Sequence, residues 1–234
     1  MEKVIHERLE HLGLEKVRLP LGTPASKPHV PIFVEADIKS KKRVVLIFGQ
    51  SVQDLGLLAG RIANGPGGID KGSMVSVVRE LRARDPSCPP GVILANMGQL
   101  YWWPEGKRPL TITAKAAIPM SSLVHAGVRY SPLLNDIPKN EDPTRHVDYM
   151  FADVLPQMIA EDALLDIIAV GDSCETVEKF LDEEKNWNVW GKRLSSMVLL
   201  ETVCTEESLT NASFKGFLAK VCPLRRVLLY SLDD

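Results

Sequence analysis

The sequence has few of the features that mark several common classes of protein. It contains only four cysteines, Cys88, Cys174, Cys204 and Cys222, and no two of them form a CxxC pair. This excludes a disulfide-rich scaffold, gives no ligand spacing for a metal site, and indicates a reducing, intracellular compartment. No apolar run is long enough to cross a membrane, and the charged N-terminus lacks the apolar core of a signal peptide. We therefore expect neither a membrane segment nor secretion.

The chain also lacks an excess of charge of either sign. It has 28 basic and 30 acidic residues, which gives a formal net charge of -2. Such a balance provides no general attraction to nucleic acid or to an anionic membrane. No basic stripe with interleaved aromatic residues is present, so direct RNA binding is not predicted. No motif for a cofactor is present, so we predict none.

Apolar strands and amphipathic helices alternate along most of the 234 residues. The expected strands, which are rich in aliphatic residues, are 43–48, 91–97, 163–170, 195–203 and 225–232. The expected helices are 51–63, one capped by Ser73, one capped by Asp142 with Pro143 at its first position, 175–184 and 209–221. Strands that are apolar on both faces predict a three-layer αβα sandwich with a mostly parallel sheet. We assign residues 1–31 to an N-terminal helix and linker, and residues 32–234 to one α/β domain.

Small and polar residues follow several of the expected strands. Gly49 and Gln50 come after the first buried strand, Asn96 ends the second, and Gly171 to Ser173 and Glu201 follow the next two. Ligands of open α/β sheets bind at the carboxyl ends of the strands. These residues are therefore candidates for lining a pocket.

The segment AVGDSCETVEKF, residues 169–180, has the strand, turn and helix of a nucleophile elbow with Ser173 at its tip. An elbow needs small residues two positions before and two positions after the nucleophile. Gly171 meets the first need, whereas Glu175 fails the second and, together with Asp172, adds negative charge near a developing oxyanion. The motif thus has the outline of a hydrolase without all its residues.

A catalytic base is the second missing part of such a site. In α/β hydrolases the histidine follows the serine in the chain, but all five histidines here precede Ser173. His125 or His146 could serve only as a base out of the usual order, with the backbone amides of Gln50 and Cys174 as oxyanion donors. A serine hydroxyl without a base is a weak nucleophile.

Aromatic residues are concentrated in QLYWWPEGKRPLTIT, residues 99–113, which we expect to form a hairpin turning at 104–106. Adjacent residues of a strand point to opposite faces, so Tyr101, Trp102 and Trp103 cannot all be buried on one side. One side belongs in the core, and the other packs on a helix or exposes an aromatic anchor for a protein partner.

Several segments together resemble the fungal Arb-two domain family, named for argonaute-binding protein two and also found C-terminal in fungal class II histone deacetylases. They are SVQDLGLLAGRI, GGIDKGSMVSVVRELR, PPGVILANMGQLYWW, NEDPTRHVDYMFADVL and DIIAVGDSCETVEKFLDE, and the resemblance extends from about Arg43 to the C-terminus. It implies an α/β-hydrolase-like fold and a role as an interaction module in chromatin-silencing and small-RNA complexes, in the nucleus, the cytoplasm or both. Family members continue beyond the strand at which this chain stops, which suggests a shortened C-terminal part.

Residues and resemblance together predict a non-catalytic, hydrolase-like protein-interaction module. Its expected partners are proteins of argonaute or histone-deacetylase complexes, and a homodimer is left open. The pocket or partner-binding candidates are Gly49, Gln50, Asn96, Tyr101, Trp102, Trp103, Asp172, Ser173 and Glu175. The alternative is an esterase-like serine hydrolase with Ser173 as its nucleophile.

Overall fold

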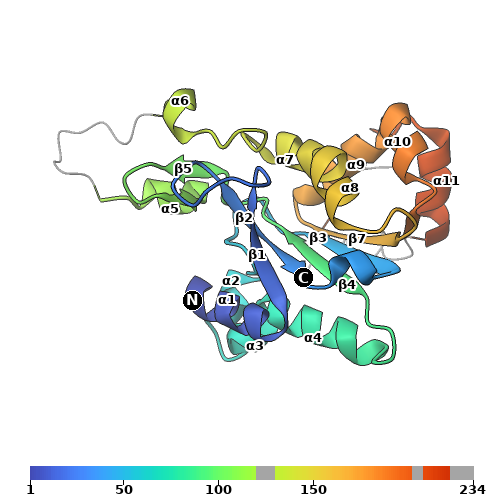
Figure 1. The fold of residues 1–234 in the computed structure, drawn as a ribbon, viewed down its shortest axis with the longest axis horizontal. Helices are drawn as coiled ribbons and strands as arrows, with labels where there is room; N and C mark the ends of the chain where they lie inside the picture. Colours follow the sequence, from blue (N-terminus) through green and yellow to red (C-terminus); the bar gives the residue numbers. More distant parts are fainter. Residues whose placement is uncertain (120–129, 202–207, 222–234) are drawn as a thin grey trace, which may run out of the picture.

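The computed structural model describes residues 1–119, 130–201 and 208–221 and places a six-stranded sheet between two layers of helices (Figure 1). Across the sheet the strands run β1 (Leu14–Leu19), β2 (Val30–Glu35), β4 (Gly91–Ala95), β3 (Arg43–Phe48), β7 (Leu164–Val170) and β8 (Leu194–Leu200). The last four are parallel to one another, while β2 is antiparallel to both of its neighbours. The predicted three-layer, mostly parallel, hydrolase-like α/β fold is therefore confirmed.

The helices divide between the two faces of the sheet (Figure 1). One face carries α1 (Glu2–His11), α2 (Gly60–Ala63), α3 (Gly68–Gly72) and α4 (Met74–Arg84). The other carries α7 (Pro143–Tyr149), the π-helical η2 (Met150–Val154), α8 (Leu155–Met158), α9 (Ser173–Asp182), α10 (Glu184–Trp190) and α11 (Ala212–Val221). The remaining elements are η1 (Ile38–Ser40), the hairpin of β5 (Tyr101–Trp103) and β6 (Arg108–Leu110), α5 (Ile112–Ala116) and α6 (Pro132–Asn135). No helix of the described residues is both long and apolar enough to cross a bilayer.

Strand β3 contributes side chains to the hydrophobic cores on both faces of the sheet. Its residues alternate between faces, as they do in any strand. Val44, Leu46 and Phe48 are buried in the core beneath α7 and α9. Val45 and Ile47 are buried in the second core, beneath α1 and α4. This burial on both faces explains the continuous apolar run in the sequence.

Two predicted helix starts agree with the structure because a side chain caps each one. The Asp142 carboxylate accepts a hydrogen bond from the Arg145 amide at 2.9 Å, with Pro143 in the first turn of α7. The Ser73 hydroxyl accepts one from the Val75 amide at 3.3 Å at the start of α4. Each cap satisfies an amide that has no partner within its own helix.

The N-terminal half differs from the sequence prediction in two places. Residues 14–19 form strand β1 and pair with β2, so the segment 1–31 contains an edge strand of the main sheet as well as the expected helix and connecting segment. Residues 51–59 are turns, and only Gly60–Ala63 is helical there. Gly56 has a φ of +83°, and a Cβ at this position would lie 2.9 Å from Ile5. The segment around Gly56 thus packs closely against α1 in a non-helical conformation, where the sequence predicted a helix. The predicted strand at 225–232 lies outside the described residues.

Candidate functional site

The carboxyl ends of β3, β7 and β8 are joined by side-chain hydrogen bonds. The Gln50 amide, after β3, donates to the Glu201 carboxylate, after β8, at 3.1 Å. The Ser51 backbone amide donates to the Asp172 carboxylate at 3.1 Å, and the Ser51 hydroxyl donates to the same group. The structure therefore brings Gln50, Asp172 and Glu201 together at the predicted edge, and it adds Ser51, which the sequence analysis had not singled out.

The sharp turn between β7 and α9 is centred on Gly171. Strand β7 ends at Val170, Gly171 has a φ of +63°, and α9 begins at Ser173. A side chain at Gly171 would bring its Cβ to 2.8 Å from both Cγ and Nε2 of Gln50. In a nucleophile elbow the strained residue of the turn is the nucleophile itself. The elbow predicted at Ser173 is therefore two residues out of register, and glycine occupies the strained position.

This register also accounts for the small residues around the turn. Two positions before and after Gly171 stand Ala169 and Ser173, both small enough for strand and helix to approach closely. Glu175 is on the exposed side of α9, 2.7 Å from the Lys179 ammonium. The turn could have been located from a pattern of three small residues spaced two positions apart. These are Ala169, Gly171 and Ser173, with the glycine directly after the strand.

Ser173 is a buried helical residue. Its side chain is 1% exposed, and its hydroxyl donates a hydrogen bond to the carbonyl of Gly49. The next amide, that of Cys174, donates to the Gly171 carbonyl at 3.1 Å. The predicted oxyanion donor at Cys174 is therefore already engaged. Burial, with a smaller contribution from Glu178, raises the pKa of the Cys174 thiol to about 12, so this cysteine is not a thiolate at neutral pH.

His146, which the structure describes, does not form a dyad with Ser173. His146 is fully buried, and its Nδ1 lies 2.6 Å from the Asn140 side-chain oxygen. Its Nε2 has no hydrogen-bond partner, so it does not bond to the Ser173 hydroxyl. Burial lowers the pKa of His146 to about 3, which keeps the ring neutral. His125 lies outside the described residues.

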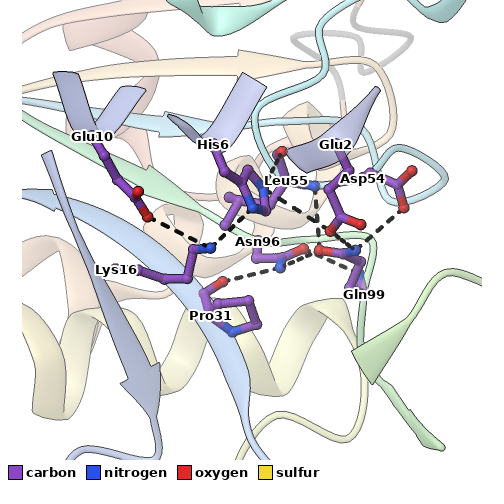
Figure 2. Close-up of polar contacts among 9 residues, drawn as sticks. All are labelled: Glu2, His6, Glu10, Lys16, Pro31, Asp54, Leu55, Asn96 and Gln99. Atoms are coloured by element: carbon purple, nitrogen blue, oxygen red, sulfur yellow. Dashed lines mark hydrogen bonds and ion pairs between the residues drawn. The ribbon is translucent and has the colours of Figure 1, made fainter. Parts of the chain in front are cut away.

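Asn96 belongs to a different polar network, between α1 and the loop after β4 (Figure 2). Its amide donates to the Pro31 carbonyl at 3.0 Å and to the Gln99 side-chain oxygen at 2.9 Å. Gln99 in turn donates to the Glu2 and Asp54 carboxylates at 2.7 and 3.3 Å. Asn96 thus fixes the N-terminal helix to the sheet and makes none of the hydrogen bonds that join the strand ends at Gly171.

The aromatic residues of β5 are less exposed than a partner-anchoring role requires. Tyr101 and Trp102 are buried, and Trp103 is half-buried, with the Arg108 guanidinium 5.7 Å from its ring centre. The prediction of an exposed aromatic anchor is therefore wrong for Tyr101 and Trp102. Large exposed apolar side chains occur nearby instead, on and beside α5 and α6. This α5–α6 apolar patch consists of Ile112, Tyr130, Leu133 and Leu134, which are 71%, 55%, 96% and 60% exposed.

The site contains no arrangement suited to a metal ion. Throughout the described ranges, no three side chains of histidine, cysteine, aspartate or glutamate come together in a way that could hold one. The carboxylates Asp172 and Glu201 already accept hydrogen bonds from Ser51 and Gln50.

The fold and the glycine-centred turn define a hydrolase-like α/β sandwich without a conventional elbow nucleophile. The family model of the Arb2 domain matches residues 1–224, so the chain belongs to the Arb2 domain family. The resemblance predicted from the sequence is thereby confirmed.

Two other comparisons add little to this assignment. Among solved structures, a histone deacetylase from Saccharomyces cerevisiae is similar at 14% identity and a TM-score of 0.42, covering 85% of this chain and 67% of that chain. A search of curated proteins gives no match.

Proposed function

We propose that the protein is a non-catalytic, hydrolase-like interaction module. The observation that carries the proposal is Gly171 at the strained position of the turn after β7, with the Gln50 side chain packed where a nucleophile would project. Ser173, the serine predicted as the nucleophile, is buried and donates its hydroxyl to a backbone carbonyl. A nucleophile needs both an exposed oxygen and an adjacent base.

The interaction role is supported by the α5–α6 apolar patch. Single exposed apolar residues are ordinary, but four large ones on and beside two short helices that both contact β5 are typical of a surface that another protein covers. Leu133 is 96% exposed, so its apolar side chain is buried hardly at all by the fold of this chain. We infer that this patch contacts a protein partner.

Membership of the Arb2 domain family supports a cellular setting for this partner. By the family resemblance, the partner is a protein of an argonaute or histone-deacetylase complex, and the chain acts in gene silencing at heterochromatin, in the nucleus, the cytoplasm or both. The near-neutral net charge of -2 favours a protein partner over direct contact with nucleic acid.

Fluorophosphonate labelling tests the non-catalytic part of the proposal. Purified protein and the Ser173→Ala variant would be treated with the probe and examined by intact mass and peptide mapping. We expect no adduct at Ser173, because its hydroxyl is buried and engaged with Gly49. A stoichiometric adduct at Ser173, with ester turnover lost in Ser173→Ala, would establish the serine hydrolase instead.

Co-purification tests the interaction part. The tagged chain and its Leu133→Ser, Leu134→Ser double variant would be compared for recovery of argonaute and class II histone-deacetylase subunits from cells. Both leucines are exposed, so the double variant keeps the fold and should lose the partner. Equal recovery of the partner by both proteins would show that this patch is not the contact surface.

A further inference from the structure

A cavity lies beside the loop after β4, next to the hairpin of β5 and β6. Its volume is about 410 Å³, within the range of sites for small molecules. Most of its wall is apolar or aromatic, from Met97, Leu100, Tyr101, Leu110, Ile112 and Tyr130. Ser51, which hydrogen-bonds to Asp172, also lines this cavity, whereas the residues 171–173 of the turn do not.

A cation already occupies the aromatic part of this cavity. The ammonium of Lys115, on α5, lies 4.5 Å from the ring centre of Tyr101 and 5.5 Å from that of Tyr130. Aromatic faces attract cations at such distances through the negative potential over the ring. The two tyrosine rings thus form a cation-binding site, which the ammonium of Lys115 occupies.

Three carboxylates give the same cavity an acidic wall. Asp136 accepts a hydrogen bond from the Tyr130 hydroxyl, Glu141 accepts one from the Lys139 amide at 3.0 Å, and Asp142 caps α7. None of them lies within ion-pair distance of Lys115 in the described structure. With Lys115 withdrawn, the formal charge of the lining is negative, which favours a cationic ligand over an anionic one.

The hydroxyl of Tyr101 has no hydrogen-bond partner. The residue is 8% exposed, and this hydroxyl is buried. Burial and then the Glu105 carboxylate raise the pKa of this phenol, while the nearby Asn135 amide acts in the opposite direction. A buried hydroxyl without a partner costs free energy unless a ligand or water completes it. The cavity therefore has a pair of aromatic rings that bind a cation, and one of these tyrosines carries a buried hydroxyl without a hydrogen-bond partner.

We propose that this cavity binds a small organic cation with an alkylated ammonium group, which displaces the Lys115 ammonium from the two tyrosine rings. An alkylated ammonium is more weakly hydrated than a lysine ammonium, so it loses less on leaving water and gains the same attraction to the rings. This binding activity goes beyond the interaction role proposed above, although the cavity shares Ile112 and Tyr130 with the α5–α6 apolar patch.

The probe that tests the proposal is choline, titrated into the full chain and followed by calorimetry and by NMR of the tyrosine rings. The matched control ligand is 3,3-dimethyl-1-butanol, which has the shape of choline without its charge. We expect choline to bind and the neutral alcohol to bind at least about 5-fold more weakly. Lys115→Ala removes the resident cation, and we expect it to tighten choline binding by about 5- to 30-fold.

Tyr130→Leu supplies the converse test, because Tyr130 is 55% exposed and its loss leaves the core intact. We expect about 5-fold weaker choline binding in this variant, and unchanged binding in Val189→Ala, an exposed position on α10. The proposal is overturned if choline binds to neither wild type nor Lys115→Ala. It is equally overturned if the neutral alcohol binds as well as choline, or if Lys115→Ala weakens the binding.

Discussion

The side chain of Gln50 lies against Gly171 at the point where strand β7 turns into helix α9. A Cβ on Gly171 would be 2.8 Å from Gln50 Cγ, and the Gln50 amide is held by the Glu201 carboxylate at 3.1 Å. Side chains from the ends of β3 and β8, the two strands that flank β7, thus close the position from which an elbow nucleophile would project. The backbone has the strand, turn and helix of a hydrolase elbow, with glycine at the strained position and Gln50 packed against it.

Substitution of Gly171 should destabilise the fold. Gly171→Ala places a side chain at a φ of +63° and against Gln50, and we expect a loss of about 1–3 kcal/mol in the free energy of unfolding. Adding Gln50→Ala should recover the steric part of the loss and leave the part due to the backbone conformation. Urea denaturation of the single and double variants measures both.

Gly216→Ala is the matched control for this substitution. Gly216 is inside helix α11, and nothing lies within 4 Å of the position its Cβ would take. Alanine has the higher helix propensity, so this variant should be more stable by up to about 1 kcal/mol. If Gly171→Ala were as stable as Gly216→Ala, the turn would not be strained and the packing argument would be wrong.

The four parallel strands of the sheet were predictable because each is a run of apolar residues. The run Arg43–Phe48 is apolar at successive positions, and its observed bounds are those expected from the sequence. Strand β1, in contrast, reads Leu, Glu, Lys, Val, Arg, Leu, with three charged residues on the exposed edge of the sheet. An edge strand needs no continuous apolar run, so only its pairing with β2 distinguishes it from a loop.

The candidate site was predictable only in its position. Parallel strands place their carboxyl ends at one edge, which is sufficient to bring Gln50, Asp172 and Glu201 together. The register of the turn depends on the φ of Gly171 and on the Gln50 contact, which comes from a residue 121 positions away. No local pattern specifies such a contact. The sequence therefore predicted the centre of the turn at Ser173, two residues after its observed position at Gly171.

The buried His146 should make stability depend on pH. Its folded-state pKa is lowered by burial from 6.5 to about 3, so between these values the unfolded chain binds a proton that the folded chain does not. Stability should therefore fall as pH is lowered from about 6.5 toward about 3, by at most about 1.4 kcal/mol per pH unit from this residue. Above about pH 6.5 this residue contributes no slope. Urea unfolding at a series of pH values gives the dependence.

His146→Gln removes this titration while keeping a polar side chain near Asn140. Its absolute stability will differ from that of wild type, so the informative quantity is the slope. We expect a shallower fall in stability between about pH 6.5 and 5 than in wild type. Parallel curves for the two proteins would mean that His146 does not remain neutral in the folded state.

Gln99 connects helix α1 to the rest of the fold through all of its polar atoms (Figure 2). Its side-chain oxygen accepts hydrogen bonds from the Leu55 amide at 3.3 Å and from Asn96 at 2.9 Å. Its amide group donates to two carboxylates, Glu2 and Asp54. Burial and then the charge of Glu2 raise the pKa of Asp54, while the charge of Arg108 and then the hydrogen bond from Gln99 lower it. The Gln99 amide is thus one of the groups that stabilise the two nearby carboxylates.

Gln99→Glu exchanges this donor for a third carboxylate, and we expect a loss of about 2–4 kcal/mol at about pH 7. The repulsion raises the folded-state pKa of the introduced carboxyl above its unfolded value, so the penalty is present at high pH and shrinks as pH falls through the folded-state value. Urea unfolding at about pH 7 and about pH 5, relative to wild type, measures this relief. Gln99→Met is the control, since it loses the same hydrogen bonds without adding a charge, and its deficit should change less with pH. Equal pH dependence of the two deficits would show that hydrogen bonding alone, and not charge, decides how α1 is held.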